Sequence, residues 1–209
     1  GSPNSGVFSI INKSWIIVNG LDFEGCNQPF YSRSIGVTGS SWGSVTIRNC
    51  IIANSLSSGI FIQGAYDLGA KPSGITITNN TIHDINGHGV FTRYGMSGLR
   101  SGGNVMDNIG VVGGGDCYGF FGNDSPSTQE DFIIDGDSLG SCPIKSHVIM
   151  DDQMFNITFR NTKFRGTNGF AGFDFSGTGT NIYIYNNEFS VKVANFRSPL
   201  TWNTDKGNQ

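Results

Sequence analysis

The stretch Gly74-Ile75-Thr76-Ile77-Thr78-Asn79-Asn80-Thr81-Ile82-His83 decides the fold of this chain. Its isoleucines alternate with threonines, which is the pattern of a β-strand with one buried face. Asn79 follows the strand, and asparagine tolerates the left-handed backbone of a sharp corner better than most residues. Ile82 stands three positions after that corner and marks a second buried position. The stretch therefore predicts a strand, a corner and a second strand.

The same pattern returns along the whole chain. The predicted corners are all Gly or Asn, which reach positive φ at low cost: Gly20, Asn49, Asn79, Asn108, Gly136, Asn161 and Asn186. Two residues before each corner stand apolar residues: Val18, Ile47, Ile77, Met106, Ile134, Phe159 and Ile184. Three residues after each corner stand others: Phe23, Ile52, Ile82, Val111, Leu139, Phe164 and Phe189. Four residues before the corner the apolar column is broken only by Asn104. The repeat shortens from about 30 to about 25 residues, which indicates a solenoid of about seven coils.

Each coil also contains a third, glycine-rich apolar run. These runs cover residues 34–38, 59–63, 89–93, 119–121, 148–151 and 172–175. Three short strands per coil resembles the right-handed parallel β-helix of the pectate-lyase-like superfamily. The resemblance covers residues 15–191 and rests on segments 45–50 (VTIRNC), 75–80 (ITITNN), 156–161 (NITFRN) and 181–187 (NIYIYNN). We therefore expect an all-β fold in one domain over 1–209, with coils over about 14–195 and a C-terminal tail over 196–209. Such a fold hosts many functions and does not by itself name one.

Composition limits the partners and the location. The 209 residues carry a net charge of −3, which argues against a nucleic-acid partner. No apolar run approaches the length of a membrane span, and no signal peptide begins the chain. Cys117 and Cys142 precede the third strands of successive coils, where they can meet as a disulfide or as two buried thiols. We expect a secreted or cell-surface protein, with end-to-end self-association or a flanking segment as further partners.

Alternation assigns the two faces of the third strands. One outward row is predicted to contain Phe61, Phe91, Phe121, Ile149 and Asp174. The next row is predicted to contain Gln63, Arg93, Asn123, Asp151 and Ser176. Neighbouring coils lie about 4.8 Å apart, so the members of a row are neighbours in space. Long polar loops over 64–73, 94–103 and 122–130 are expected to form a wall beside this face, where binding often occurs.

Aromatic rings beside a cation and carboxylates suit an extended acidic polysaccharide. Rings stack on sugar faces, arginine binds carboxylates through paired hydrogen bonds, and carboxylates act as acid and base. The candidate catalytic residues are Arg93, Asp151 and Asp174. The candidate substrate-binding residues are Phe61, Gln63, Phe91, Tyr94, Lys71, Arg100 and Asn123. Two plainer interpretations stay open: the aromatic row is a ladder that only stiffens the sheet, and Arg93 and Asp151 form an ordinary solvated contact.

The resemblance implies two kinds of enzyme. Polygalacturonase-like hydrolases carry a lone Asp, then an Asp pair, a Gly-His-Gly and an Arg-x-Lys. Here Gly87-His88-Gly89 precedes Asp151-Asp152 by two coils and no Arg-x-Lys is present, so those roles are not transferred.

Pectate-lyase-like enzymes neutralise a uronate with Ca²⁺ or basic residues and use Arg or Lys as the base. Arg93 is then the candidate base. Ca²⁺ is a candidate cofactor, with oxygen ligands from four carboxylates: Asp116, Asp124, Asp151 and Asp174. The alternative to a carbohydrate-active protein is a non-catalytic segment of an adhesin, a tailspike or another extracellular assembly.

Overall fold

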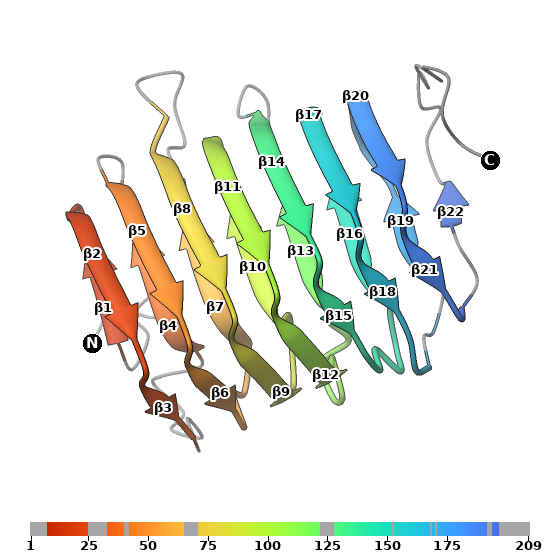
Figure 1. The fold of residues 1–209 in the computed structure, drawn as a ribbon, viewed down its shortest axis with the longest axis horizontal. Helices are drawn as coiled ribbons and strands as arrows, with labels where there is room; N and C mark the ends of the chain where they lie inside the picture. The colour runs from red at the N-terminus through yellow and green to blue at the C-terminus, as the bar shows by residue number, and fades with distance from the viewer. Residues whose placement is uncertain are drawn as a thin grey trace.

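The computed structural model describes residues 8–24, 33–39, 42–64, 71–121, 128–151, 153–167, 169, 171–191 and 194–196. Within these ranges the regular elements are all β-strands, and they form three parallel sheets of eight, seven and seven strands. Figure 1 shows the coils stacked along one axis. The predicted β-solenoid with three strands per coil is confirmed. The described residues contain no helix long and apolar enough to cross a membrane.

We name the sheets A, B and C. Sheet A contains the six predicted third strands: β4 (Arg33–Thr38), β7 (Ser58–Gln63), β10 (Val90–Arg93), β13 (Tyr118–Phe121), β16 (Val148–Asp151) and β19 (Phe173–Phe175). It also contains two strands that were not predicted, β1 (Phe8–Ile11) and β22 (Ala194–Phe196). Sheet B contains β2 (Ser14–Asn19), β5 (Gly43–Arg48), β8 (Ser73–Thr78), β11 (Met96–Gly102), β14 (Gln129–Asp135), β17 (Gln153–Arg160) and β20 (Thr178–Tyr185). Sheet C contains β3 (Asp22–Phe23), β6 (Ile51–Ala53), β9 (Thr81–Ile85), β12 (Val105–Ile109), β15 (Ser138–Leu139), β18 (Lys163–Phe164) and β21 (Glu188–Phe189).

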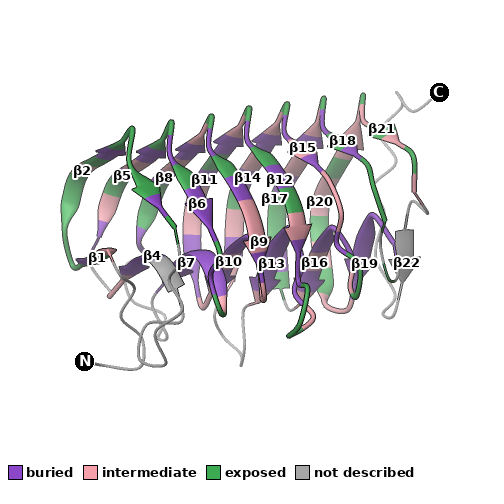
Figure 2. Ribbon diagram, turned by 90° about the horizontal axis from the view of Figure 1, so that it is seen from below, coloured by how far each residue is buried: buried purple, intermediate pink, exposed green. Residues whose placement is uncertain are grey.

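The inward side chains of the three sheets form one continuous apolar core. Figure 2 shows buried and exposed residues alternating along the strands. Ile47 and Ile77 are adjacent in the register of β5 and β8, and both are fully buried. Burial of each such side chain contributes roughly 1.5–3 kcal/mol. The core therefore extends along the whole stack of coils.

The predicted register of the fourth coil is wrong. Gly102 pairs with Thr78, so the corner after β11 is Gly103 and not Asn108. The column four residues before the corner is continued by Leu99, which pairs with Ile75. Glycine replaces asparagine at this corner because both adopt positive φ, and Gly103 has a φ of +68°. The apparent break at Asn104 came from aligning the wrong corner.

Two further residues of that coil change columns as a result. Met106 belongs to sheet C, where it pairs with Ile82 and Leu139. The place of Met106 in the sheet B column is taken by Ser101, a buried serine that pairs with Ile77 and Ile134. Val111, predicted to face the core, is exposed. The repeat length is also uneven, because Asn104 lies 24 residues after Asn80 and 33 residues before Asp137.

Buried polar side chains form a ladder one residue after the corners. The Oδ1 atom of Asn80 accepts the backbone N–H of Cys50 at 3.0 Å, and Oδ1 of Asn104 accepts that of Asn80 at 2.9 Å. Oδ1 of Asp137 accepts the backbone N–H of Asn104 at 2.7 Å. The recurring corner residues by themselves predict an asparagine ladder at the corners, such as Asn79, and the buried ladder lies one residue later. Asn79 is exposed, because the left-handed corner turns its side chain outward.

Two other left-handed columns were not predicted. The first lies near the ends of sheet C strands, within β9 and β12, where Nδ2 of Asn108 donates to Asp84 Oδ1 at 2.5 Å. The second lies within the sheet B strands and comprises Trp15, Ser44, Gly74, Gly98, Asp131, Asn156 and Asn181. It bends each sheet B strand near its start. The prediction of a loop over 94–103 is wrong, because most of this stretch forms β11.

Cys117 and Cys142 do meet. Their Sγ atoms lie 2.8 Å apart as two free, buried thiols. Burial raises the pKa of the Cys117 thiol, and the contact with Cys142 raises it further. The predicted tail over 196–209 lies outside the described residues, apart from Phe196 at its start.

Candidate functional site

The outer face of sheet A carries two rows of outward residues. Phe61 pairs with Phe91, Phe91 pairs with Gly119, Gly119 with Ile149, and Ile149 with Asp174. Phe121 was predicted in this row, and that placement is wrong. It belongs to the next row, which contains Gln63, Arg93, Phe121 and Asp151. The error arose because β13 was aligned two residues out of register with β10, so that Phe121 stood in the place of Gly119.

Two of the predicted site residues are not available at the surface. Phe61 and Asp174 are each only 1% exposed. Alternation places them on the outer face, yet neither side chain presents an accessible surface to a polymer. We therefore exclude both from the site. Asn123 lies outside the described residues.

Arg93 is half-buried at the centre of the second row. Its guanidinium lies 4.8 Å from the centroid of the Tyr94 ring, a cation–π contact. Among the described residues its buried Nε atom has no hydrogen-bond partner. Tyr94 has a φ of 65°, a strained value for a bulky residue that is often found at functional sites. The pair is an oriented cation whose Nε atom is buried and unpaired among the described residues.

His88 lies on the same face, and the sequence interpretation missed it. Its ring stacks on Phe91 at 4.6 Å and meets the edge of Phe121 at 5.5 Å. A Cβ atom at Gly119 would lie 2.6 Å from His88 Nδ1, so glycine in the outward row makes room for the imidazole. A glycine among bulky outward residues was the signal that could have revealed this placement.

The backbone around Asp116 orients His88. The backbone N–H of Asp116 donates to His88 Nδ1 at 3.1 Å, which leaves the proton of the neutral ring on Nε2. The Asp116 carboxylate lies 3.4 Å from the same Nδ1 atom and accepts the backbone N–H of Ser146 at 3.0 Å. Burial raises the pKa of Asp116. No described residue bonds Nε2, so His88 presents a free donor at a side chain that is 18% exposed.

Asp151 lies two strands beyond Arg93, with Phe121 between them. Its Oδ1 accepts a hydrogen bond from Ser176 Oγ at 2.9 Å. Two strand steps correspond to about 9–10 Å. Arg93 and Asp151 therefore flank one aromatic ring and do not form a direct ion pair. Whether either residue is catalytic stays a prediction.

The remaining predicted binding residues lie elsewhere. Lys71 forms an ion pair with Glu130 at 2.9 Å and also bonds Thr128. Arg100 lies on the outer face of sheet B. Within the described ranges no group of three or more His, Cys, Asp or Glu side chains is placed to hold a metal ion. Of the proposed calcium ligands, Asp116 and Asp174 are buried and Asp124 lies outside those ranges, so the calcium hypothesis stays a prediction.

The chain belongs to the right-handed β-helix family, whose model matches residues 5–189. Among solved structures it is similar to the enzymatically active domain of tailspike protein 2 of bacteriophage CBA120, with a TM-score of 0.61 and 12% sequence identity. The similarity covers 96% of this chain and 37% of that domain. No curated protein sequence matches the chain. The predicted handedness is confirmed, and at this identity the structural likeness supports the fold alone.

Proposed function

We propose that the chain binds an acidic polysaccharide along the outer face of sheet A. The observation that carries the proposal is the cluster of Arg93 and His88 around two aromatic rings, Phe91 and Phe121. His88 offers a donor at Nε2 that has no partner among the described residues, and Arg93 supplies a positive charge held by the Tyr94 ring. Such convergent polar groups beside apolar surface are the usual form of a ligand site.

The ligand class follows from charge and geometry. Arg93 is cationic and His88 offers an N–H, so both favour a carboxylate or a similar anion on the ligand. The half-buried rings of Phe91 and Phe121 offer apolar contact for a sugar ring. The face continues along the stack of strands, which suits an extended polymer better than a single sugar. A secreted or cell-surface location is part of the same proposal. The similarity in fold to a tailspike enzyme domain supports it.

Cleavage of the bound polymer is a separate part of the proposal. Arg93 is the candidate group at the reacting sugar, and Asp151 is the candidate carboxylate one aromatic ring away. The alternative is a non-catalytic β-helix segment. Lyase action forms an unsaturated uronate, which absorbs ultraviolet light, and hydrolysis forms new reducing ends without that absorbance. Measuring both after incubation with acidic glycans distinguishes cleavage from the non-catalytic alternative.

The binding experiment compares two arginines. We expect Arg93→Ala to weaken binding of a galacturonate oligosaccharide at least about tenfold, because a charge-assisted hydrogen bond contributes about 1.5–3 kcal/mol. The control is Arg48→Ala, which removes an exposed arginine from sheet B. His88→Gln should also weaken binding, since the glutamine amide does not reproduce the oriented Nε2–H. Equal affinities for wild type, Arg93→Ala and His88→Gln in titration calorimetry would refute the sheet A site.

A further inference from the structure

A hollow with a polar lining lies on the outer face of sheet B. It has a volume of about 580 Å³, and its lining includes Thr78, Arg100, Gly102, Asp135 and Arg160. Gly102 creates the hollow, because it stands between Thr78 and Asp135 in the outward row and has no side chain. A Cβ atom at this position would lie 2.8 Å from the backbone oxygen of Asp135. The backbone of the neighbouring coil therefore keeps the gap open.

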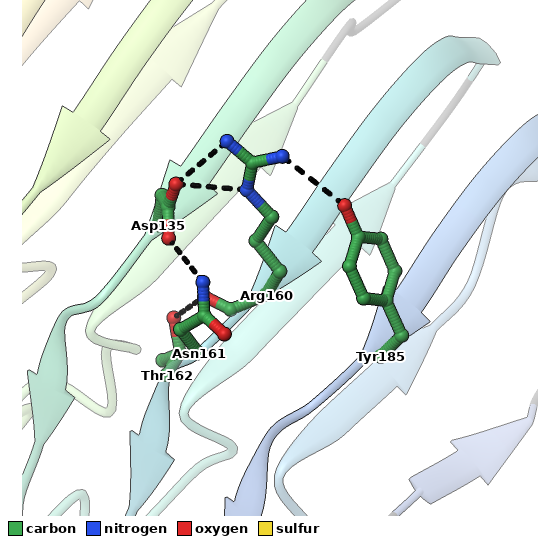
Figure 3. A network of polar contacts seen from close by, with 5 residues as sticks. All are labelled: Asp135, Arg160, Asn161, Thr162 and Tyr185. Carbon is green, nitrogen blue, oxygen red and sulfur yellow. Dashed lines mark hydrogen bonds and ion pairs between the residues drawn. The ribbon is translucent and has the colours of Figure 1, made fainter.

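One wall of the hollow is a fixed cation. Arg160 donates from Nε and Nη2 to Asp135 Oδ2 at 2.8 and 2.7 Å, and from Nη1 to the hydroxyl of Tyr185 at 3.2 Å. Figure 3 shows the guanidinium held between these two partners, and Asn161 donating to the other carboxylate oxygen. The hydrogen bond from Asn161 lowers the pKa of Asp135, and so does the contact with Arg160. The carboxylate is therefore ionised, and Arg160 is oriented before any ligand arrives.

A second arginine of the lining, Arg100, has donors that no described residue uses. Arg100 is exposed, and its Nη1 atom donates to the backbone oxygens of Leu99 at 3.0 Å and Asp131 at 2.5 Å. Within the described part of the chain, Nη1 is the one atom of this guanidinium that makes a hydrogen bond. These two bonds anchor one edge of the group. Nε and Nη2 remain as donors for a ligand.

The charges in the hollow sum to a positive value, although the chain as a whole is acidic. Arg100 and Arg160 contribute two positive charges, and Asp135 contributes one negative charge. A planar guanidinium with free parallel donors matches a carboxylate. The hollow therefore selects an anionic group.

We propose that this hollow is a second glycan-binding site, in addition to the one on sheet A. Arg100, on the outer face of sheet B, binds the carboxylate of an acidic sugar there. The surface on either side carries groups suited to sugars. Thr76 pairs with Arg100 on one side, and Ile133, Thr158 and Tyr183 follow on the other. Tyr183 is exposed and lies three strand steps from Arg100, or about 14 Å. An oligosaccharide running along the coils can reach both residues.

The test separates this site from the one on sheet A. Arg93→Ala is introduced first, so that the contribution of the sheet A site is reduced. In that background we expect Arg100→Gln to weaken binding of a galacturonate oligosaccharide at least about tenfold, through the lost charge-assisted contact. The matched control Arg48→Gln removes an exposed arginine of the same sheet that is absent from the lining of the hollow, and it should change the affinity less than about twofold. Far-ultraviolet circular dichroism and thermal melting check that each variant is folded.

Two further ligands and one spectroscopic readout complete the experiment. The methyl-esterified oligosaccharide should not bind, and free galacturonate should bind more weakly than the oligosaccharide. In amide NMR spectra, titration should shift Thr78, Gly102 and Asp135. The inference is overturned if Arg100→Gln and Arg48→Gln bind alike, if the esterified ligand binds as well as the acid, or if these amides do not move. If free galacturonate binds as tightly as the oligosaccharide, the inference that the site extends along the coils is overturned. If the proposed sheet A site fails its own test, all of these expectations for the sheet B hollow still hold.

Discussion

At the scale of single residues, the buried polar ladder determines how the coils align. Asn80 donates from Nδ2 to the backbone oxygen of Ile47 at 3.0 Å, while its Oδ1 accepts the N–H of Cys50. The side chain thereby satisfies backbone groups at a corner, where the sheet ladders are interrupted. A buried backbone group without a partner costs about 1–3 kcal/mol. An apolar residue at this position fills the space but leaves both groups unpaired.

Asp137 gives this ladder a pH dependence. It is fully buried, accepts hydrogen bonds from Asn104 and Ser101, and also accepts one from the hydroxyl of Tyr118 at 2.5 Å. Burial raises the pKa of Asp137 despite these bonds. The folded protein therefore holds the proton more tightly than the unfolded chain. The resulting stabilisation is complete below the unfolded pKa of about 3.9 and is lost as the pH rises through the folded value.

We predict that Asp137→Asn removes this dependence. The asparagine amide cannot ionise, yet it retains an oxygen for Asn104 and gains donors for Tyr118 and Ser101. The free energy of unfolding of the wild type, relative to the variant, should fall as the pH increases above about 4. Urea unfolding across a pH series measures the difference. A constant difference at every pH would show that Asp137 has an ordinary pKa.

At the scale of the strand, each inward side chain packs between its counterparts in the two neighbouring coils. Ile77 of β8 is fully buried, and it pairs with Ile47 on one side and Ser101 on the other. We predict that Ile77→Ala lowers the free energy of unfolding by about 2–5 kcal/mol, because the rigid stack cannot close the cavity. The control is Thr46→Ala, an outward change on β5 that should cost less than about 1 kcal/mol. Equal effects of the two changes would contradict the assignment of faces.

The sequence alone predicts the repeated strands well because their inward positions alternate. It fails at the fourth coil, where Ser101 replaces an apolar residue and glycine replaces asparagine at Gly103. Both replacements depend on contacts that are distant in sequence. Ser101 lies inside the core because its Oγ contacts the Tyr118 hydroxyl at 2.5 Å and donates to Asp137 at 3.0 Å. Alternation cannot reveal such a polar group at a core position.

The candidate site was predicted only in part for a similar reason. Arg93 was placed correctly on the outer face of sheet A, since strand alternation is a local property. His88 lies before β10, and only the space above Gly119 in the next coil determines where its ring lies. Arg100 was expected in a loop beside Arg93 and instead lies in β11 of another sheet. The inward residues Met96 and Leu99, on either side of the left-handed Gly98, fix that strand.

At the scale of the whole molecule, each coil contacts only its neighbours, so stability is a sum over adjacent coils. The first and last sheet B strands are less protected than the central ones. Trp15 of β2 is 83% exposed and Ile17 is 63% exposed, while Ile182 and Ile184 of β20 are only partly buried. These end strands are the natural place for end-to-end association, which stays a prediction.

We predict that hydrogen exchange proceeds from the ends of the stack toward its centre. Backbone amides of β8, β11 and β14 should exchange most slowly, because coils cover them on both sides. Amides of β2 and β20 should exchange faster under the same conditions. Mass-spectrometric or NMR exchange measurements resolve these segments. Uniform protection across all sheet B strands would indicate that the stack opens only as a whole.

The parallel, in-register stacking described above also affects how this protein must be assayed. All strands lie across the long axis at a spacing of about 4.8 Å, which is the spacing that defines cross-β fibres. A single folded molecule therefore contains a short stretch of fibril-like backbone. Dyes and diffraction signatures that report amyloid are expected to respond to the native protein. Aggregation of a destabilised variant must consequently be judged by particle size, and not by a fibril-specific stain.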